Sequence, residues 1–180
     1  MVVAVAGRRI DGPDAEFPRF PLRNVAVVGK RIRSLLETHT AIALVSSAAC
    51  GSDLIALGQA SSMGIRCRVI LPFDRVRFRA TSVTDRPGDW GPVYDRLIDK
   101  VASSKDLIVC PESAEDAPAF STVNRLILNE AETLAHAVHH LPIVVLVWDL
   151  QARGDDDLTK SFGDDARQRG MQVLSVSTLD

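Results

Sequence analysis

The sequence predicts an α/β protein with a doubly wound, mainly parallel sheet of six strands and helices on both faces. Six short apolar runs recur along the 180 residues, and a helical pattern lies between each successive pair. Each run is continuous rather than alternating, which is typical of strands that are buried on both faces. Regular strand–helix alternation implies right-handed crossovers in one open sheet. These observations together indicate a Rossmann-like architecture.

The predicted strands and helices follow in order along the chain. Apolar runs place strands at 2–6, 41–45, 67–71, 107–110, 143–148 and 173–176. Apolar residues at three- and four-residue steps predict helices over 25–36, 93–101 and 123–138. Ser121 or Thr122 is the predicted N-cap of the last of these. Two shorter helices are expected to end before Gly64 and Gly170, where a left-handed residue commonly terminates a helix.

Composition and charge limit the classes of function. Hydrophobic residues make up 46% and charged residues 24% of the chain, as in an ordinary globular domain, so residues 1–180 are expected to form one domain. The net charge is −2, so no overall positive field favours DNA or an anionic membrane, and neither is expected as a partner. No apolar stretch is long enough to cross a bilayer, and no secretory signal is visible. Three cysteines without a CxxC pair favour a reducing compartment, so a cytoplasmic location is expected.

Two connections are longer than the two to six residues, roughly, that compact α/β units need. They span 7–22 and 72–92, and each follows a predicted strand at the edge where open α/β sheets bind ligands. The second carries Phe73, Phe78, Ser82 and Trp90 among several arginines. We expect these four residues to form a lid with an aromatic face for a base. In the alternative, the aromatic side chains fill the core.

Small residues between the second strand and its helix indicate a phosphate site. They let a ligand approach the backbone, and the N–H groups at a helix start favour an anion. The alternative is a tight turn without a ligand, capped by Ser52 or Asp53. The residues predicted to cradle the anion are Ser46, Ser47, Ala48, Gly51, Ser52 and Asp53.

A second anion site is predicted directly after the first strand. Gly7 allows close approach, and Arg8 and Arg9 offer charge-assisted hydrogen bonds to a phosphate or carboxylate. In the alternative, one arginine is exposed and the other pairs with Asp11. In the usual strand order the first and fourth strands flank the ligand crevice, so Arg8 and the turn at 111–112 should face each other.

The familiar chemical motifs are missing. G-x-G-x-x-G, G-x-x-x-x-G-K-[ST], H-E-x-x-H and G-x-S-x-G do not occur. His136 and His140 are four residues apart, but no carboxylate motif accompanies them, and no metal is expected.

The segments VVAVAGRRID (2–11) and VSSAACGSDLIALGQASSMGIRCRVILPF (45–73) resemble the SLOG superfamily. This superfamily comprises Rossmann-like domains related to DNA-processing protein A and to the LOG phosphoribohydrolases. Its pattern is a G-x-R turn after the first strand and an S-G-x-A-x-G-x-D turn after the second. This chain keeps Gly7, Arg9, Ser46, Gly51 and Asp53, with the small Ala48 among them. Ser47 replaces the second-turn glycine.

Two departures from the family pattern affect the expected ligand site. The phosphoribohydrolase signature P-G-G-x-G-T-x-x-E is missing. Relatives often carry Gly-Gly-Thr before the last helix, where this chain has Asp155, Asp156, Asp157, Leu158 and Thr159. Three adjacent carboxylates repel an anion unless a metal or arginines compensate. The acidic run is expected to be a solvated loop.

The resemblance implies a nucleotide-binding sensor of a sort found in bacterial defence signalling. Its ligand would be NAD-like, ADP-ribose-like or another nucleotide, and binding would alter assembly or a partner's activity. Asn124 is expected to reach this ligand. A homo-oligomer, and an effector protein or fused effector domain, are the expected partners, and no cofactor is assigned beyond the nucleotide-derived ligand.

Two alternatives to the sensor remain. The first is a nucleotide N-glycosidic hydrolase like the phosphoribohydrolases, with Glu112 or Glu130 acting on the substrate. The second is a DNA-binding module like DNA-processing protein A. A ligand-binding domain without catalysis is preferred to the enzyme because the hydrolase signature is absent.

Overall fold

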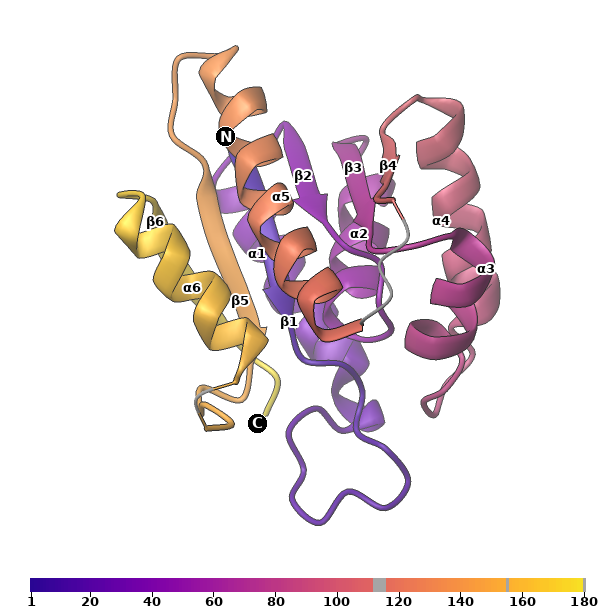
Figure 1. Cartoon of the computed structure of the whole chain (residues 1–180). Coiled ribbons are helices and arrows are strands. Elements are labelled where there is room, and N and C mark those ends of the chain that lie inside the picture. The colour runs from indigo at the N-terminus through magenta and orange to yellow at the C-terminus, as the bar shows by residue number, and fades with distance from the viewer. Residues whose placement is uncertain (112–115, 155, 180) are drawn as a thin grey trace.

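Strands and helices alternate along the chain in the computed structural model, which describes residues 1–111, 116–154 and 156–179 (Figure 1). The strands are β1 (Val2–Gly7), β2 (Ala43–Ser46), β3 (Arg66–Leu71), β4 (Leu107–Val109), β5 (Ile143–Trp148) and β6 (Gln172–Ser177). The helices are α1 (Val25–Thr38), α2 (Ser52–Ser62), α3 (Arg75–Phe78), α4 (Gly91–Ser103), α5 (Asp116–His136) and α6 (Leu158–Gln168). A 3-10 turn, η1 (Leu22–Asn24), precedes α1, and a π-type turn, η2 (Arg79–Val83), follows α3.

Six strands of the described chain form one sheet in which every neighbouring pair is parallel. Helices α1, α2 and α4 cover one face, and α5 and α6 cover the other (Figure 1). Strand β1 shows why its residues are continuously apolar. Val3 and Val5 pack toward α1 and α2, whereas Val2 and Ala4 pack toward α5 and α6. The predicted Rossmann-like α/β sheet is confirmed.

The strand order differs from the expected one. It is β4-β3-β2-β1-β5-β6, so β1 lies beside β5 and not beside the fourth strand. The chain adds β2, β3 and β4 in one direction before α5 carries it back across the sheet to β5. Strand β4 is therefore at one edge of the sheet, separated from β1 by β2 and β3, and residue 112 of the predicted turn lies outside the described residues. The expectation that the first and fourth strands flank the ligand crevice is wrong.

The connection after β1 extends beyond the sheet and is closed on itself by Asp11 (Figure 1). Both carboxylate oxygens of Asp11 accept from the backbone N–H groups of Arg19 and Phe20, at 3.0–3.1 Å. The backbone N–H of Asp11 also donates to the Phe20 carbonyl at 3.0 Å. Asp11 therefore closes a loop by bonding backbone groups of Arg19 and Phe20, which differs from the alternative in which it pairs with a neighbouring arginine side chain.

The connection after β3 is not an open lid. It contains α3 and η2, and its aromatic side chains enter the core between α2 and α4. Phe73 is 2% and Trp90 7% exposed, and the Trp90 Nε1 donates to the Pro87 carbonyl at 2.9 Å. The ring of Phe78 stacks on that of Tyr94 with centroids 6.1 Å apart. The burial of Phe73 and Trp90 therefore favours the alternative of a packed loop over the predicted lid for these two residues.

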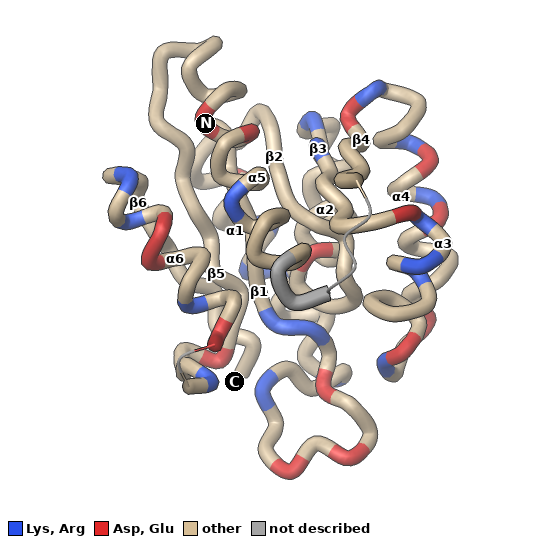
Figure 2. Tube along the Cα trace, in the orientation of Figure 1, with Lys and Arg blue, Asp and Glu red and all other residues tan. Residues whose placement is uncertain are grey.

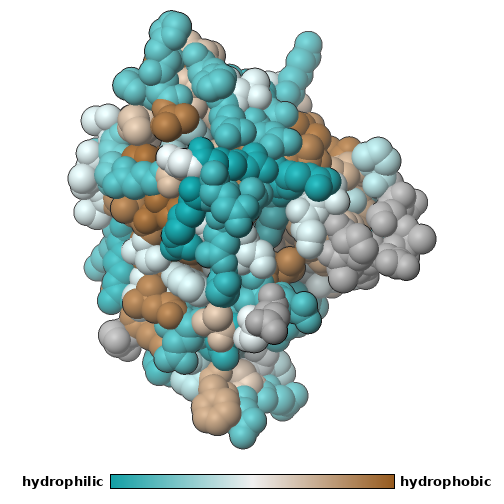
Figure 3. Space-filling view, turned by 60° about the vertical axis from the view of Figure 1, so that its left-hand side comes forward, coloured by the Kyte–Doolittle hydropathy of each residue, from teal (hydrophilic) through white to brown (hydrophobic). Residues whose placement is uncertain are grey.

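Four smaller observations complete the fold. Helix α5 begins at Asp116, so Ser121 and Thr122, the predicted N-caps, lie inside it. Among the described residues, no helix combines the length and apolarity that crossing a bilayer requires. Acidic and basic residues are interspersed along the chain (Figure 2). Apolar residues on the face seen in Figure 3 form separate patches between polar ones.

Candidate functional site at the carboxyl edge of β1

Two of the cavities that the described residues form meet where β1 ends. The larger cavity has a volume of about 850 Å³ and is lined by the loop after β1, by Arg86 and by the segment leading into α6. The smaller cavity has a volume of about 280 Å³ and lies between β1, the turn after β2, η2 and α5. Gly7, Arg9, Leu158 and Thr159 line both. The carboxyl edge of the sheet is thus hollowed where open α/β sheets bind ligands.

Close backbone packing joins β1, the start of α2 and β5 beneath these cavities. The Arg8 backbone N–H donates to the Val147 carbonyl at 2.8 Å, and the Ser52 backbone N–H donates to the Arg8 carbonyl at 3.1 Å. The Ser52 hydroxyl also bonds the Arg8 carbonyl, at 2.7 Å. A Cβ on Gly7 would overlap the Val147 carbonyl oxygen. Glycine is required here because the Val147 carbonyl and the Ser52 side chain occupy the space of a side chain.

The predicted phosphate cradle divides in the structure. Ser47 and Asp53 line the smaller cavity. The remaining members are buried in the turn: the Ser46 hydroxyl donates to the Ser47 carbonyl at 2.7 Å, and Gly51 and Ser52 face the backbone after β1. The first N–H of α2 is therefore occupied by a carbonyl of its own chain. This geometry favours a tight turn without a ligand for Ser46, Ala48, Gly51 and Ser52, all of which are buried. The N-cap of α2 is Gly51, so the predicted cap by Ser52 or Asp53 is wrong.

Gly51 provides a test of this packing. Its φ is +93°, and an added Cβ would lie 2.9 Å from both the Arg8 carbonyl oxygen and the Ile10 nitrogen. Gly64 has a similar φ of +73° but open space around it. We expect Gly51→Ala to lower the free energy of unfolding by about 1–3 kcal/mol more than Gly64→Ala, because only Gly51→Ala also overpacks. Denaturant melts measure both, and equal losses would mean that the approach to Arg8 and Ile10 is not tight.

Arg8 does not point a free guanidinium at a ligand. Its side chain is 6% exposed, and its Nε donates to Asp149 at 2.9 Å. Its two Nη atoms donate to the Asp157 carboxylate at 2.9 and 2.7 Å, and Nη2 also bonds the Gln151 carbonyl. The guanidinium lies 5.7 Å from the Trp148 ring centroid. Arg8 therefore ties the end of β1 to the segment between β5 and α6.

Asp157 is a structural member of this cluster. Its side chain has no exposed surface, and it caps α6 by accepting from the backbone N–H groups of Thr159 and Lys160 at 2.9 and 3.1 Å. Burial opposes its charge, but the bonds from Arg8, Lys160 and Arg153 lower the pKa of Asp157 to about 2. The acidic run was expected to be a solvated loop. That expectation is wrong for Asp157, which is buried. Asp156 is exposed, and residue 155 lies outside the described residues.

Arg9 lies where the two cavities join. Its guanidinium pairs with Asp85, and the side chains of both residues are about one-third exposed. In the described part of the chain, the buried Nε atoms of Arg9 and Arg86 have no hydrogen-bond partner. Arg9 therefore retains donor capacity beside a cavity, as the sequence predicted for an anion site.

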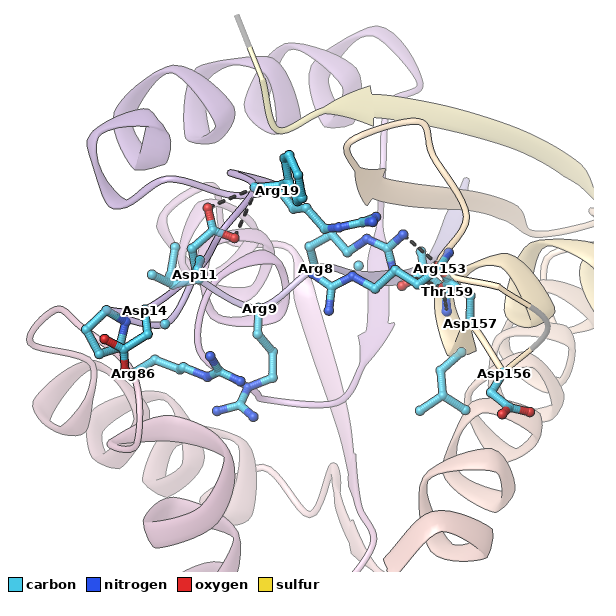
Figure 4. Close-up of a pocket in the computed structure, with 17 residues that line it drawn as sticks. Arg8, Arg9, Asp11, Asp14, Arg19, Arg86, Arg153, Asp156, Asp157 and Thr159 are labelled. Atoms are coloured by element: carbon cyan, nitrogen blue, oxygen red, sulfur yellow. Dashed lines mark hydrogen bonds and ion pairs between the residues drawn. The ribbon is translucent and has the colours of Figure 1, made fainter.

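Cations converge on the larger cavity from three segments (Figure 4). Arg19 comes from the loop after β1, Arg86 from the connection before α4 and Arg153 from the segment before α6. Loss of hydration lowers the pKa of Arg153, and the charges of Arg8 and Arg19 lower it further. An anion in this cavity would relieve that repulsion.

The smaller cavity has mainly apolar walls with a few polar groups. Phe78, Phe120, Val123 and Ile127 supply apolar surface. Ser82 and Asn124 also line it, and the Asn124 Nδ2 donates to the Leu158 carbonyl at 3.2 Å. The predicted ligand residues Phe78, Ser82 and Asn124 are thus brought together with Arg9 at one cavity. An apolar pocket with few convergent polar groups is the common form of a small-molecule site.

Glu130, one of the two predicted catalytic glutamates, lines neither of these cavities. Glu130 lies on α5 and pairs with Arg68 of β3 at 2.6 Å. The same Arg68 binds Asp106, which precedes β4. Glu112 lies outside the described residues. Glu130 therefore serves an ion pair on the sheet face, and its geometry gives no support to a hydrolase.

Several residues of the site were not predicted. Arg19, Arg86 and Arg153 belong to no motif, and their convergence depends on where three loops fold. The sequence could have indicated Asp149 as a site residue, because it is an acidic residue directly after the strand at 143–148. Assigning it to Arg8 requires knowing that β1 lies beside β5.

Comparison with known proteins gives fold neighbours and no closer relative. No family model and no curated protein matches the chain. The solved structure of DNA processing protein A from Streptococcus pneumoniae matches with a TM-score of 0.46 and 17% identity, covering 96% of this chain and 57% of that one. DNA processing protein A from Helicobacter pylori matches with a TM-score of 0.46 and 16% identity, covering 96% and 74%. The chain therefore spans less than two-thirds of the Streptococcus protein.

The chain has a Rossmann-like fold with an all-parallel sheet of six described strands. The description of the Helicobacter protein refers to its mode of binding single-stranded DNA. This finding stands against the expectation from net charge that nucleic acid is not a partner, and that expectation is withdrawn. At these levels of similarity the match describes the fold, and the ligand of this chain has to be argued from its own residues.

Proposed function

We propose that this chain binds a nucleotide-derived small molecule, with an anionic group in the larger cavity and a base in the smaller one. The position of Arg9 carries the proposal, because this guanidinium lines both cavities at their junction. The convergence of Arg19, Arg86 and Arg153 on the larger cavity supports an anion on one side. Apolar walls that include Phe78 and Phe120 support a ring on the other.

The test is calorimetric titration with NAD, ADP-ribose and AMP, with adenosine as the ligand that lacks phosphate. We expect Arg9→Ala to weaken binding of the phosphate-containing ligands about 10- to 100-fold, because a charge-assisted hydrogen bond contributes about 1.5–3 kcal/mol. Stability should change little, since the Arg9–Asp85 pair is partly exposed. Arg33→Ala is the matched control, because Arg33 pairs with Glu37 on the surface of α1.

Single-stranded DNA is the alternative to a free nucleotide as the ligand of this site. A single-stranded oligonucleotide also presents phosphate beside a base, and one protein of similar fold is described as a binder of single-stranded DNA. Binding of the oligonucleotide without any binding of free nucleotides would reassign the site to DNA. Equal affinities of Arg9→Ala and the unmodified chain for ADP-ribose would contradict the role of Arg9. Release of free base during the same incubations would instead indicate an N-glycosidic hydrolase.

The resemblance also predicts a sensing role, a homo-oligomer and an effector partner. These stay predictions. If they hold, ADP-ribose or NAD should change the sedimentation of the chain, and Arg9→Ala should abolish that change.

A further inference from the structure

The anion and base sites leave one buried acid without a role. Asp53 is 8% exposed and lines the smaller cavity together with Phe78, Val123 and Ile127. A carboxylate among apolar side chains is costly unless it is paired or protonated. Among the described residues that line the smaller cavity, which include Ser47 and Ser82, Asp53 is the one acidic residue.

The hydrogen bonds of Asp53 determine where a proton resides. Its Oδ2 accepts from the Ala49 backbone N–H at 3.1 Å. Because that oxygen acts as an acceptor, the neutral carboxyl carries its proton on Oδ1 and offers one O–H donor. Burial raises the pKa of Asp53 to about 7, against the opposing effects of the Ala49 N–H and the Arg9 charge.

The charged groups around Asp53 decide which form a ligand meets. Arg9 from the loop after β1 favours the carboxylate, and Asp85 from the connection before α4 partly neutralises Arg9. Cys50 is a neutral thiol, because burial raises its pKa. The described residues of α5 and α6 that line the smaller cavity are uncharged. A ligand phosphate on Arg9 would cancel the main charge favouring the carboxylate, so the bound state favours neutral Asp53.

We propose that Asp53 selects the base, donating a hydrogen bond from its neutral carboxyl to N1, the unprotonated ring nitrogen beside the exocyclic amino group, of a purine such as adenine. This inference rests on the proposed function, because it needs a base in the smaller cavity. Adenine presents ring nitrogens as acceptors. Hypoxanthine carries a hydrogen on the ring nitrogen beside its exocyclic oxygen, so two donors would meet at that position. An unpaired donor in a dry pocket is penalised, which makes such a contact selective.

The test compares NAD with nicotinamide hypoxanthine dinucleotide by calorimetry from pH 6 to pH 8. Dinucleotides are chosen because phosphate monoesters titrate near pH 6 and would obscure the result. The Kd for NAD should rise about tenfold over this range, since binding requires the proton that Asp53 loses. At pH 6 the hypoxanthine compound should bind at least about tenfold more weakly than NAD.

Two variants separate this role from a purely structural one. Asp53→Asn keeps an oxygen for the Ala49 N–H and an N–H donor for the base, so it should bind NAD at pH 6 within about threefold of the unmodified chain, with no pH dependence. Asp53→Ala removes the donor and should weaken binding at pH 6 about tenfold. Persistence of the pH dependence in Asp53→Asn would overturn the proposal.

The outcomes distinguish the two proposals. If no nucleotide binds at any pH, both the proposed function and the role of Asp53 fail. If NAD binds with a Kd that does not change with pH and equals that of its hypoxanthine analogue, only the role of Asp53 fails.

The protonation state of Asp53 can be tested without a ligand, from the dependence of stability on pH. Because the folded pKa of Asp53 is raised, its contribution to stability is present below about pH 4 and is lost as pH rises through about 7. The denaturation midpoint of the unmodified chain should therefore fall over this range relative to that of Asp53→Asn. Parallel midpoints across the range would contradict a neutral Asp53.

Discussion

Arg8→Ala should lower the free energy of unfolding by about 3–5 kcal/mol, the cost of leaving buried charges unpaired. The Asp149 and Asp157 side chains are 4% and 0% exposed, and Arg8 pairs with both, while Arg19 also pairs with Asp149 at 2.9 Å. The variant also releases the Gln151 carbonyl from its bond with Arg8. Urea melts at pH 7 measure the effect.

Arg8→Ala should also change how the free energy of unfolding depends on pH in the acidic range. In the unmodified chain the pKa of Asp157 is lowered to about 2, so its contribution to stability is present above about pH 4 and lost as pH falls toward 2. Arg8→Ala removes the main partner of Asp157, and this acid-dependent loss should shrink. Arg33→Ala should cost less than about 1 kcal/mol, because its pair with Glu37 is exposed. A loss of similar size in both variants would show that the Arg8 cluster does not hold β1 to β5.

Trp90→Ala should lower the free energy of unfolding by about 3–5 kcal/mol, as truncation of a buried tryptophan does. The side chain is 7% exposed, belongs to the core cluster with Phe78 and Tyr94, and bonds the Pro87 carbonyl through Nε1. Because Trp90 packs inside the protein, affinity for NAD or ADP-ribose should stay within about threefold of the unmodified value in the folded variant. Denaturant melts and calorimetry give the two quantities.

Phe17 is the matched aromatic control for Trp90. Its ring is 72% exposed, so Phe17→Ala should change stability by no more than about 0.5 kcal/mol. If Trp90→Ala instead kept full stability and lost ligand affinity, the connection after β3 would act as a lid after all.

The sequence by itself determined the fold class. The continuous apolar runs of β1 and β5 require cover on both faces, and the alternation with helices leaves a parallel sheet as the arrangement that buries them. Gly7 and Gly51 were also recognisable, because small residues at strand ends mark close backbone approach. What they approach was not recognisable: the sequence suggested a ligand, and the structure places the backbone of Arg8, Ile10 and Val147 there.

The tertiary structure alone decided the strand order and, with it, the partners of each charge. Hydrophobic patterning is the same for a central strand whichever neighbour it has, so it could not put β5 beside β1. That adjacency brings Asp149 and Asp157 to Arg8. Arg8 was expected to bind a phosphate, and it forms buried ion pairs within the protein instead. Burial likewise separates Trp90 in the core from Arg9 at the cavities, although both lie in long polar connections. Ion pairs between loops depend on distances that no local residue pattern encodes.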